Sequence, residues 1–232
     1  MKVQFILSVL MISSIFASLP QSDSKLKIKL FAESLCPYCV MAVGKFETAI
    51  QNGLLEIADV EYYVAGNAKV TGKSGNMWQF TCQHGQNECY GNALESCIWN
   101  HAATRLDALN SIACMFSNTH TDGSLLDSAL EKCAKQFSSY DVAQVRQCAT
   151  TSEGNTLVYD TIQATPAHNG VPWETVEGMT LGDADRSGLN EDPLKWACAH
   201  AQSSDARDKI CAKYGFSDVQ VKINQLTRSL YE

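Results

Sequence analysis

Two cysteines, Cys36 and Cys39 in the run Cys36-Pro37-Tyr38-Cys39, have the types and spacing that most directly suggest chemistry. Cysteines three residues apart at the first turn of a helix lie on one face, close enough to form and reopen a small disulfide ring. Free backbone N–H groups at a helix N-terminus favour the thiolate and lower its pKa. We therefore predict thiol–disulfide exchange, with Cys36 as the attacking nucleophile and Cys39 as the resolving thiol.

The same two cysteines could instead form an inert structural bridge or half of a zinc site. Zinc would need a second ligand pair nearby, and the next cysteine is Cys82, so no metal site is expected. A C-x-x-C between an apolar strand and an amphipathic helix is the setting of a redox pair. Glu33, three residues before Cys36, would oppose the thiolate if it were charged and near, although it could equally be a solvated loop residue.

The elements that must position this pair form a strand, a helix and a strand. Residues 25–34 alternate polar and apolar and then become apolar, as a strand does when it enters a covered sheet. Residues 37–51 have apolar positions at helical spacing, and residues 59–65 are β-branched and aromatic. A βαβ unit of this length makes a parallel sheet.

The rest of the chain predicts an insertion followed by a late strand and helix. Residues 66–85 are rich in turn residues, and residues 88–150 are punctuated helix with Asp122 and Ser139 at N-cap positions. The further predicted elements are a helix over 155–164, a strand and tight turn over 173–179 and a helix over 192–201. The fold class is therefore α/β, a thioredoxin-like βαβ…ββα fold over residues 25–205 with a disulfide-rich helical insertion at about 66–150.

Val171 and Pro172 precede the late strand and are the predicted substrate-binding residues. Thioredoxin-like enzymes place a cis-proline beside the active cysteines, where the backbone of the preceding residue can pair with a substrate chain like an added strand. A trans turn proline is the alternative, because only about one X-Pro bond in twenty is cis.

Residues 1–20 have the layout of a cleaved signal peptide. Lys2 is followed by an apolar run over 3–16, then small residues and Pro20, and the run is short for a membrane span. A buried helix or a signal anchor is the alternative reading. The mature protein is expected in the lumen of the secretory pathway.

Ten cysteines are many for 232 residues, and a secretory route would place them where disulfides persist. Cys198 and Cys211 could close a local loop, but the sequence does not define the other pairings. The candidates for structural disulfides are the eight outside the C-x-x-C pair: Cys82, Cys89, Cys97, Cys114, Cys133, Cys148, Cys198 and Cys211.

The composition restricts which kinds of binding partner are expected. A net charge of -7 without a Lys/Arg cluster argues against nucleic acid and anionic membranes as partners, because both need a positive surface. With 45% hydrophobic residues the chain can bury a substantial core.

A second motif, CQHGQNECYGNALESC from Cys82 to Cys97, fits the pattern C-Q-H-G-x2-E-C-x2-N-x4-C. It resembles the signature of the gamma-interferon-inducible lysosomal thiol reductase (GILT) family. The resemblance extends to the upstream C-x-x-C, to Trp78-x-Phe80, to the later single cysteines and to the VPWETVEG segment. It implies a thioredoxin-like fold with a helical insertion, and an enzyme that reduces protein disulfides in acidic endolysosomal compartments through Cys36 and Cys39.

The signature residues themselves have a plain chemical reading. Cys82, Cys89 and Cys97 with His84 could bind zinc, but an acidic oxidising lumen would protonate the ligands, and structural disulfides are favoured. We expect His84 and Glu88 to be local hydrogen-bonding or substrate-groove residues rather than acid–base catalysts. At about pH 5, well under one unperturbed thiol in a thousand is ionised, so attack by Cys36 needs a strongly lowered pKa.

The resemblance leaves the destination and the redox direction open. The chain has no N-x-S/T sequon for the glycan-dependent lysosomal delivery that the family suggests, so secretion is the alternative, and residues 206–232 resemble a tail lost on maturation. Potentials of thioredoxin-like proteins differ by more than ~100 mV, which leaves an oxidase or isomerase possible. A non-enzymatic binding module with a permanent bridge is a further alternative.

The expected partners follow from the reductase reading. They are disulfide-containing protein substrates and a small external thiol as electron donor, with no bound cofactor. The protein is expected to be a monomer or a homodimer.

Overall fold

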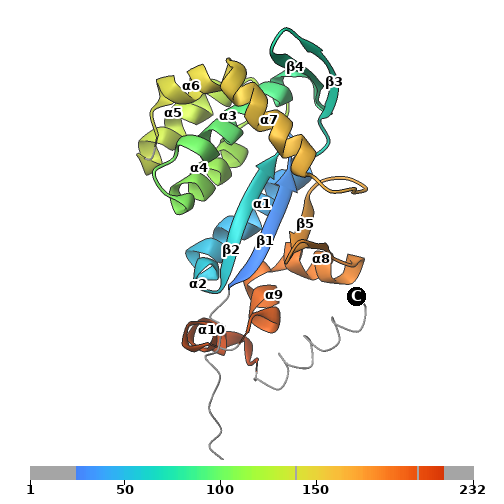
Figure 1. Cartoon of the computed structure of the whole chain (residues 1–232). Coiled ribbons are helices and arrows are strands. Elements are labelled where there is room, and N and C mark those ends of the chain that lie inside the picture. Colours follow the sequence, from blue (N-terminus) through green and yellow to red (C-terminus); the bar gives the residue numbers. More distant parts are fainter. Residues whose placement is uncertain (1–24, 139, 203, 217–232) are drawn as a thin grey trace, which may run out of the picture.

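A βαβ unit forms the centre of the computed structural model, which describes residues 25–138, 140–202 and 204–216 (Figure 1). Strand β1 (Leu26–Ala32) leads through helix α1 (Pro37–Gln51) to strand β2 (Ala58–Val64). The two strands pair in parallel over their whole length. All three predicted elements are confirmed to within a residue or two, and the predicted signal peptide lies outside the described residues.

The remaining elements follow in chain order. They are α2 (Leu54–Ile57), β3 (Lys69–Ser74), β4 (Met77–Thr81), α3 (Gln86–His101), α4 (Arg105–Asn118), α5 (Leu126–Phe137), α6 (Val142–Ala149), α7 (Ser152–Ala164), β5 (Trp173–Val176), β6 (Met179–Thr180), α8 (Asp183–Glu191), α9 (Pro193–His200), α10 (Asp205–Cys211) and a 3-10 turn, Ala212–Tyr214.

The main sheet has the strand order β2-β1-β5-β6, with β5 antiparallel to β1. Helices α8 and α9 pack against α1, and α3 and α7 contact β2 (Figure 1). Strand β1 is buried on both faces in its C-terminal half, where Leu30, Phe31 and Ala32 are all inaccessible. A parallel βαβ unit extended by an antiparallel hairpin and a helix is the thioredoxin-like arrangement, so the predicted fold class is confirmed.

The helices between β2 and β5 are tied together by disulfides. Cys97–Cys148 joins α3 to α6, and Cys114–Cys133 joins α4 to α5. The remaining two bonds are local: Cys82–Cys89 closes the turn before α3, and Cys198–Cys211 links α9 to α10.

The prediction that Asp122 caps α5 was wrong, and α6 is capped by a residue other than the predicted Ser139. Helix α5 begins at Leu126, and the carboxylate of Asp122 accepts from the N–H of Ser124 at 2.9 Å in a local turn. Asp141 caps α6 by accepting from the N–H of Gln144. Short polar side chains compete between caps and turns, and spacing alone does not decide which they form. Ser139 lies outside the described residues.

Several elements were not predicted, among them the β3–β4 hairpin and the helices α2, α8 and α10. The turn-rich stretch 66–85 contains the β3–β4 hairpin, whose strands are mostly exposed and therefore carry little apolar alternation. Helix α8 is acidic and buries only Leu189, so it also lacks a clear hydrophobic pattern.

Residues 205–216, at the start of the predicted tail, continue as helix against the domain. Arg207 is buried, and its guanidinium donates two hydrogen bonds to the carbonyl of Cys198, at 3.2 and 3.0 Å. In the described part of the chain, none of the helices combines the length and the apolarity that crossing a bilayer requires.

Gly91 in α3 marks the tightest contact between the insertion and the segment before α1. A Cβ at this position would lie 2.2 Å from Oγ and 2.8 Å from Cβ of Ser34. We expect Gly91→Ala to lower the free energy of unfolding by about 1–3 kcal/mol, because overpacking displaces a buried neighbour. Denaturant unfolding measures this change.

Gly44 in α1 is the matched control, since a Cβ there meets nothing within 4 Å. Gly44→Ala is expected to stabilise by about 0.5–1 kcal/mol through helix propensity. Equal stability changes in the two variants would contradict the contact argument.

Candidate active site

Cys36 is the N-cap residue of α1. Its backbone is extended, with φ -74° and ψ 119°, and Pro37 occupies the first helical position. Proline is preorganised for that position and gives up an N–H that would have no partner in the helix. The Cys36 side chain therefore faces the free N–H groups of the first turn.

Several groups act on the Cys36 thiol. A hydrogen bond from the Cys39 thiol lowers its pKa most, burial opposes this, and the backbone N–H groups of Cys39 and Tyr38 and the charge of His84 lower it further. The resulting pKa is about 6, against an ordinary value of 9.0. The N–H groups of the helix terminus, which the sequence predicted to lower this pKa, do contribute, but the hydrogen bond from the Cys39 thiol lowers it more.

Cys39 differs from Cys36 chiefly in the direction in which its pKa is shifted. It is fully buried, and its sulfur accepts a hydrogen bond from the backbone N–H of Glu33 at 3.4 Å. Burial raises its pKa far above that of an ordinary thiol, with further contributions from the neighbouring Cys36. Cys36 is thus the thiol that ionises first.

The loop before β5 lies directly over Cys36. The Val171–Pro172 peptide bond is cis, and Cys36 Sγ lies 3.9 Å from the carbonyl oxygen of Val171. His168 holds this loop in place, since its Nε2 lies 2.9 Å from Oδ1 of Asn67 and its Nδ1 lies 2.8 Å from the carbonyl oxygen of Pro166. The structure therefore brings together all four residues predicted for catalysis and substrate binding.

The signature helix α3 supports the segment that leads into α1. The N–H of Ser34 donates to Oδ1 of Asn92 at 2.9 Å, and the hydroxyl of Ser34 donates to Glu95 at 3.1 Å. All three residues are buried. From the sequence we singled out neither Asn92, a fixed position of the signature, nor Glu95, one of its variable positions. Only the packing of α3 shows that both side chains point at the residues before Cys36.

Glu33, His84 and Glu88 form an acid–base cluster beside the cysteines. Glu33 is fully buried, which excludes the solvated-loop alternative, and its Oε1 accepts from the N–H of Asn67 at 2.9 Å. Its Oε2 lies 3.8 Å from Nδ1 of His84. Glu88 bonds His84 twice, through the backbone N–H at 2.9 Å and through Nδ1. The expectation of local hydrogen bonding fits these contacts.

The cluster shifts the titration of its members. Burial and the charge of Glu88 raise the pKa of Glu33, and the backbone N–H of Asn67 and the charge of His84 lower it; the resulting pKa is about 7. For His84, burial favours the neutral ring, but the hydrogen bond to Glu88 and the charges of Glu88 and Glu33 together raise its pKa.

The zinc alternative through cysteines is excluded by the disulfides. Cys82 is bonded to Cys89, and Cys97 to Cys148, so none of these sulfurs is a free thiolate. One ligand atom each of Glu33, His84 and Glu88 lies within 4.8 Å of the others, and the hydrogen bonds above account for this proximity.

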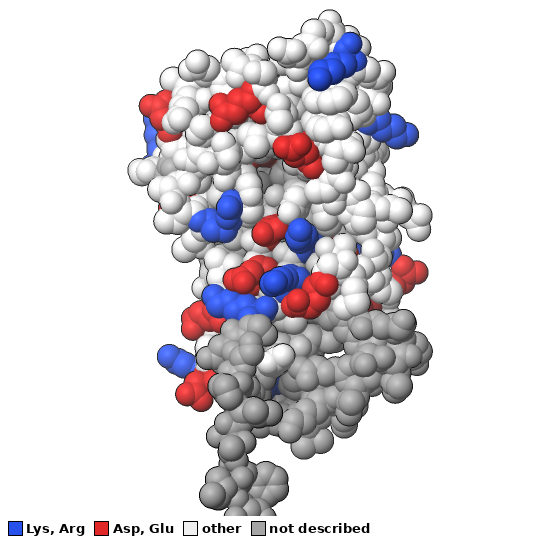
Figure 2. Space-filling view, in the orientation of Figure 1, with Lys and Arg blue, Asp and Glu red and all other residues white. Residues whose placement is uncertain are grey.

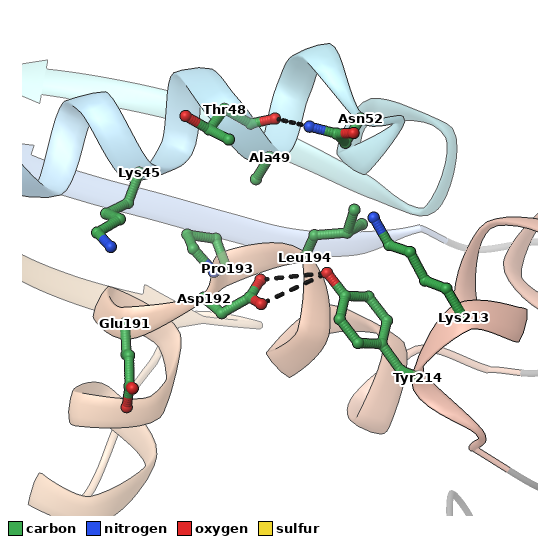
Figure 3. Close-up of a pocket in the computed structure, with 10 residues that line it drawn as sticks. All are labelled: Lys45, Thr48, Ala49, Asn52, Glu191, Asp192, Pro193, Leu194, Lys213 and Tyr214. Carbon is green, nitrogen blue, oxygen red and sulfur yellow. Dashed lines mark hydrogen bonds between the residues drawn. The ribbon is translucent and has the colours of Figure 1, made fainter.

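A cavity of about 260 Å³ lies away from the cysteines. Figure 3 shows that it opens between the C-terminal half of α1, with Lys45 and Asn52, and the segment from Glu191 to Leu194. Tyr214 crosses it and donates to Asp192. Its lining contains neither cysteine of the C-x-x-C pair, so it is not part of this site.

This protein has a thioredoxin-like fold, a C-x-x-C at the N-terminus of α1 and a cis-proline loop over the first cysteine. These features place it in the class of thioredoxin-like dithiol proteins. Residues 27–137 match the family model "Gamma interferon inducible lysosomal thiol reductase (GILT)". The chain belongs to the GILT family.

Two named relatives, from Drosophila melanogaster and Carassius auratus, agree with this assignment. GILT-like protein 2 of Drosophila melanogaster is 34% identical over 71% of this chain and 74% of its own length. The gamma-interferon-inducible lysosomal thiol reductase of Carassius auratus is 31% identical over 72% of this chain, a match that spans 65% of that protein, less than two thirds of its length. The solved structure of reduced DsbA1 from Neisseria meningitidis has 14% identity and a TM-score of 0.48, over 84% of this chain and 90% of that one.

The asymmetry of the two thiols gives a direct prediction. When the C-x-x-C is reduced and the structural disulfides are intact, iodoacetamide should modify Cys36 alone, with a rate that titrates at a midpoint near 6. Peptide mass mapping after alkylation over a pH series measures both site and midpoint. Modification of Cys39 at a comparable rate in the folded protein would contradict the asymmetry.

Proposed function

We propose that this protein is a thiol–disulfide oxidoreductase that reduces disulfides of protein substrates. The single observation that carries the proposal is the pairing of an ionisable Cys36 with a buried, protonated Cys39 under the Val171–Pro172 loop. The names of its relatives, which include thiol reductases, support the same reaction.

The reaction follows from the two thiols. The Cys36 thiolate attacks one sulfur of a substrate disulfide, forming a mixed disulfide and releasing the other substrate sulfur as a thiolate that takes a proton. Cys39 then loses its proton and attacks Cys36 Sγ, which forms the Cys36–Cys39 disulfide and releases the second substrate thiol. Two electrons pass from the cysteine pair to the substrate, and a small external thiol restores the dithiol. No bound cofactor is needed.

The surface around Cys36 fits a polypeptide substrate. Tyr38 and Met41 on the first turns of α1 are 66% and 60% exposed, unlike most large apolar residues of the chain. An extended substrate segment could lie across these side chains and pair with the backbone of Val171. On the face drawn in Figure 2, acidic and basic residues are interspersed rather than gathered by sign.

An acidic lumenal setting, lysosomal, endosomal or extracellular, fits the carboxyl groups of the interior. Glu33, Glu95 and Glu174 are fully buried, and burial raises the pKa of each. A buried carboxyl is tolerated best when it is neutral. With a pKa of about 6, roughly a tenth of Cys36 would be ionised at about pH 5, far more than of an ordinary thiol.

Substitution of each cysteine tests the mechanism. Reduction of a denatured disulfide-bonded protein by a small thiol should be accelerated by the wild type at about pH 4.5 and at about pH 7. Cys36→Ser should abolish the acceleration, because it removes the nucleophile. Cys39→Ser should trap a mixed disulfide through Cys36, detectable by mass.

Leu106→Ala is a useful comparison, because it truncates an exposed apolar side chain in the first turn of α4, outside the proposed substrate surface, and should retain turnover. Full activity of Cys36→Ser would refute the mechanism. A failure of Cys39→Ser to accumulate the mixed disulfide would refute the division of roles. Oxidation that outpaces reduction of the same substrate would favour the oxidase or isomerase alternative.

The free energy of unfolding should be higher at about pH 5 than at about pH 8. Burial raises the pKa of Glu174 from 4.5 to about 7, despite the opposing effects of Asn190 and Arg186. Because the folded-state pKa is above the unfolded one, its stabilising contribution is complete below the unfolded pKa and is lost as the pH rises through 7. The loss is up to about 3 kcal/mol between about pH 5 and pH 8. Urea unfolding of the disulfide-bonded protein at several pH values measures it.

Glu174→Gln should reduce this pH dependence by the share of Glu174, because the amide does not ionise, while the buried carboxyl groups of Glu33 and Glu95 keep theirs. Glu56→Gln, at an exposed position of α2, should leave the slope as in the wild type. A wild-type free energy of unfolding that rises from about pH 5 to pH 8 would contradict the argument.

A further inference from the structure

The cluster of Glu33, His84 and Glu88 has no part in the exchange steps described above. Glu33 follows β1, His84 lies in the turn after β4, and Glu88 is in the first turn of α3. Both carboxyl groups are fully buried, and the imidazole is partly exposed. Among the described residues, Oε2 of Glu33 has no hydrogen-bond partner and is 3.8 Å from Nδ1 of His84. Three segments thus converge on one buried set of charges next to the reactive thiol.

Glu88 holds the His84 ring and keeps it protonated. It accepts from the backbone N–H of His84 at 2.9 Å and contacts Nδ1 through its other oxygen. With both oxygens engaged by one residue, the ring has a fixed position relative to α3 and α1. A neutral imidazole would leave this buried carboxylate without a charge partner, which is costly.

We propose that the His84 imidazolium is the counter-charge of the Cys36 thiolate, and that ionisation of Glu33 withdraws this support as the pH rises toward neutral. His84 is then a positioning residue for the attacking sulfur, and Glu33 makes its effect strongest in acid. The inference rests on the proposed function, because a thiolate at Cys36 is required only if Cys36 attacks disulfides.

The mutual influence of the groups supports this assignment. The charge of His84 lowers the pKa of Cys36, and the charge of Cys36 raises the pKa of both His84 and Glu33. Cys36 is only 5% exposed and Glu33 is inaccessible, so these interactions are screened less than those between surface charges. Below the ordinary imidazole pKa of 6.5, His84, whose pKa is raised, is cationic while Glu33 is mostly neutral, so Glu33 does not oppose the effect of His84 on Cys36.

Other titratable groups that face the cluster do not reverse this balance. Cys39 on α1 and Glu95 on α3 have raised pKa values and stay neutral in acid. Through Asn67, which bonds both Glu33 and His168, the cluster is also linked to the loop before β5.

Two substitutions with opposite expected effects test the proposal. The rate of Cys36 alkylation by iodoacetamide is followed from about pH 4 to pH 8 with the C-x-x-C reduced. His84→Gln should raise the midpoint by about one pH unit and lower the rate at about pH 5 roughly tenfold. Glu33→Gln should leave the rate at about pH 5 unchanged, because Glu33 is already protonated there. It should lower the midpoint only slightly, because the Cys36 midpoint near 6 lies below the Glu33 pKa of about 7.

The chain offers a matched histidine–glutamate pair as control. At the opposite end of α3, Nε2 of His101 lies 2.7 Å from Oε1 of Glu153. His101→Gln removes an equivalent pair within the insertion, and Glu174→Gln removes another buried carboxyl. Both should leave the alkylation profile of Cys36 unchanged, and thermal unfolding of all variants checks that the fold is intact.

Reciprocity gives a second measurement that needs no substitution in the cluster. If His84 stabilises the thiolate, Cys36→Ser must lower the pKa of His84 by a similar amount, which an NMR titration of the imidazole detects. This measurement decides the question even if His84→Gln does not fold.

The proposal is overturned if His84→Gln leaves the midpoint in place or if the two cluster variants shift it in the same direction. An equal shift in His101→Gln, or an unchanged His84 titration in Cys36→Ser, would overturn it as well. Alkylation does not depend on protein-disulfide reduction. An inactive wild type with the expected profile would therefore refute the proposed function and leave this inference standing.

Discussion

The short segment between β1 and α1 carries the constraint on which the site depends. It must end a buried strand and present Cys36 at a helix N-terminus while keeping its backbone groups satisfied out of water. Asn92 accepts from the N–H of Ser34, Cys39 accepts from that of Glu33, and Glu33 in turn accepts from Asn67. Besides the local bond from the N–H of Cys36 to the carbonyl of Glu33, the bonds that hold this segment therefore depend on residues of other elements.

This dependence explains why the insertion is part of the active site rather than an appendage. Helix α3 supplies Asn92, Glu95 and Glu88, and Gly91 permits its close approach to Ser34. The Cys97–Cys148 disulfide ties α3 to α6 across a long stretch of chain, which limits the freedom of the unfolded state most. The covalent framework thus stabilises the same helix that positions the reactive segment.

The sequence predicted what is local and periodic. It defined β1, α1 and β2 closely, because burial alternates or repeats along each of them, and it named Cys36 and Cys39 from their spacing and their place at a helix start. Val171 and Pro172 could be named only because a thioredoxin-like fold was assumed. The exposed β3–β4 hairpin left little trace in the hydrophobic pattern.

The contacts that the sequence could not give are those between distant segments. Glu33 was ambiguous between a solvated loop and a neighbour of the thiol, because burial of one side chain depends on what packs over it. The eight remaining cysteines permitted many pairings, and their disulfides follow from which helices lie side by side. The signature motif identified a group of residues in the chain but did not show which residues of other segments they contact.

Under the proposed function, the protein needs opposite properties at its two sulfurs when it works in acid. The first must stay ionised where protons are abundant, and the second must remain a thiol until the mixed disulfide has formed. Burial separates the two, because it strongly opposes ionisation of Cys39, whereas Cys36 receives hydrogen bonds at the helix terminus. Buried carboxyl groups would disturb this arrangement if they were charged, yet acid neutralises Glu33 and removes the nearest opposing charge. The same protonation that disables an ordinary thiol therefore improves the surroundings of this one.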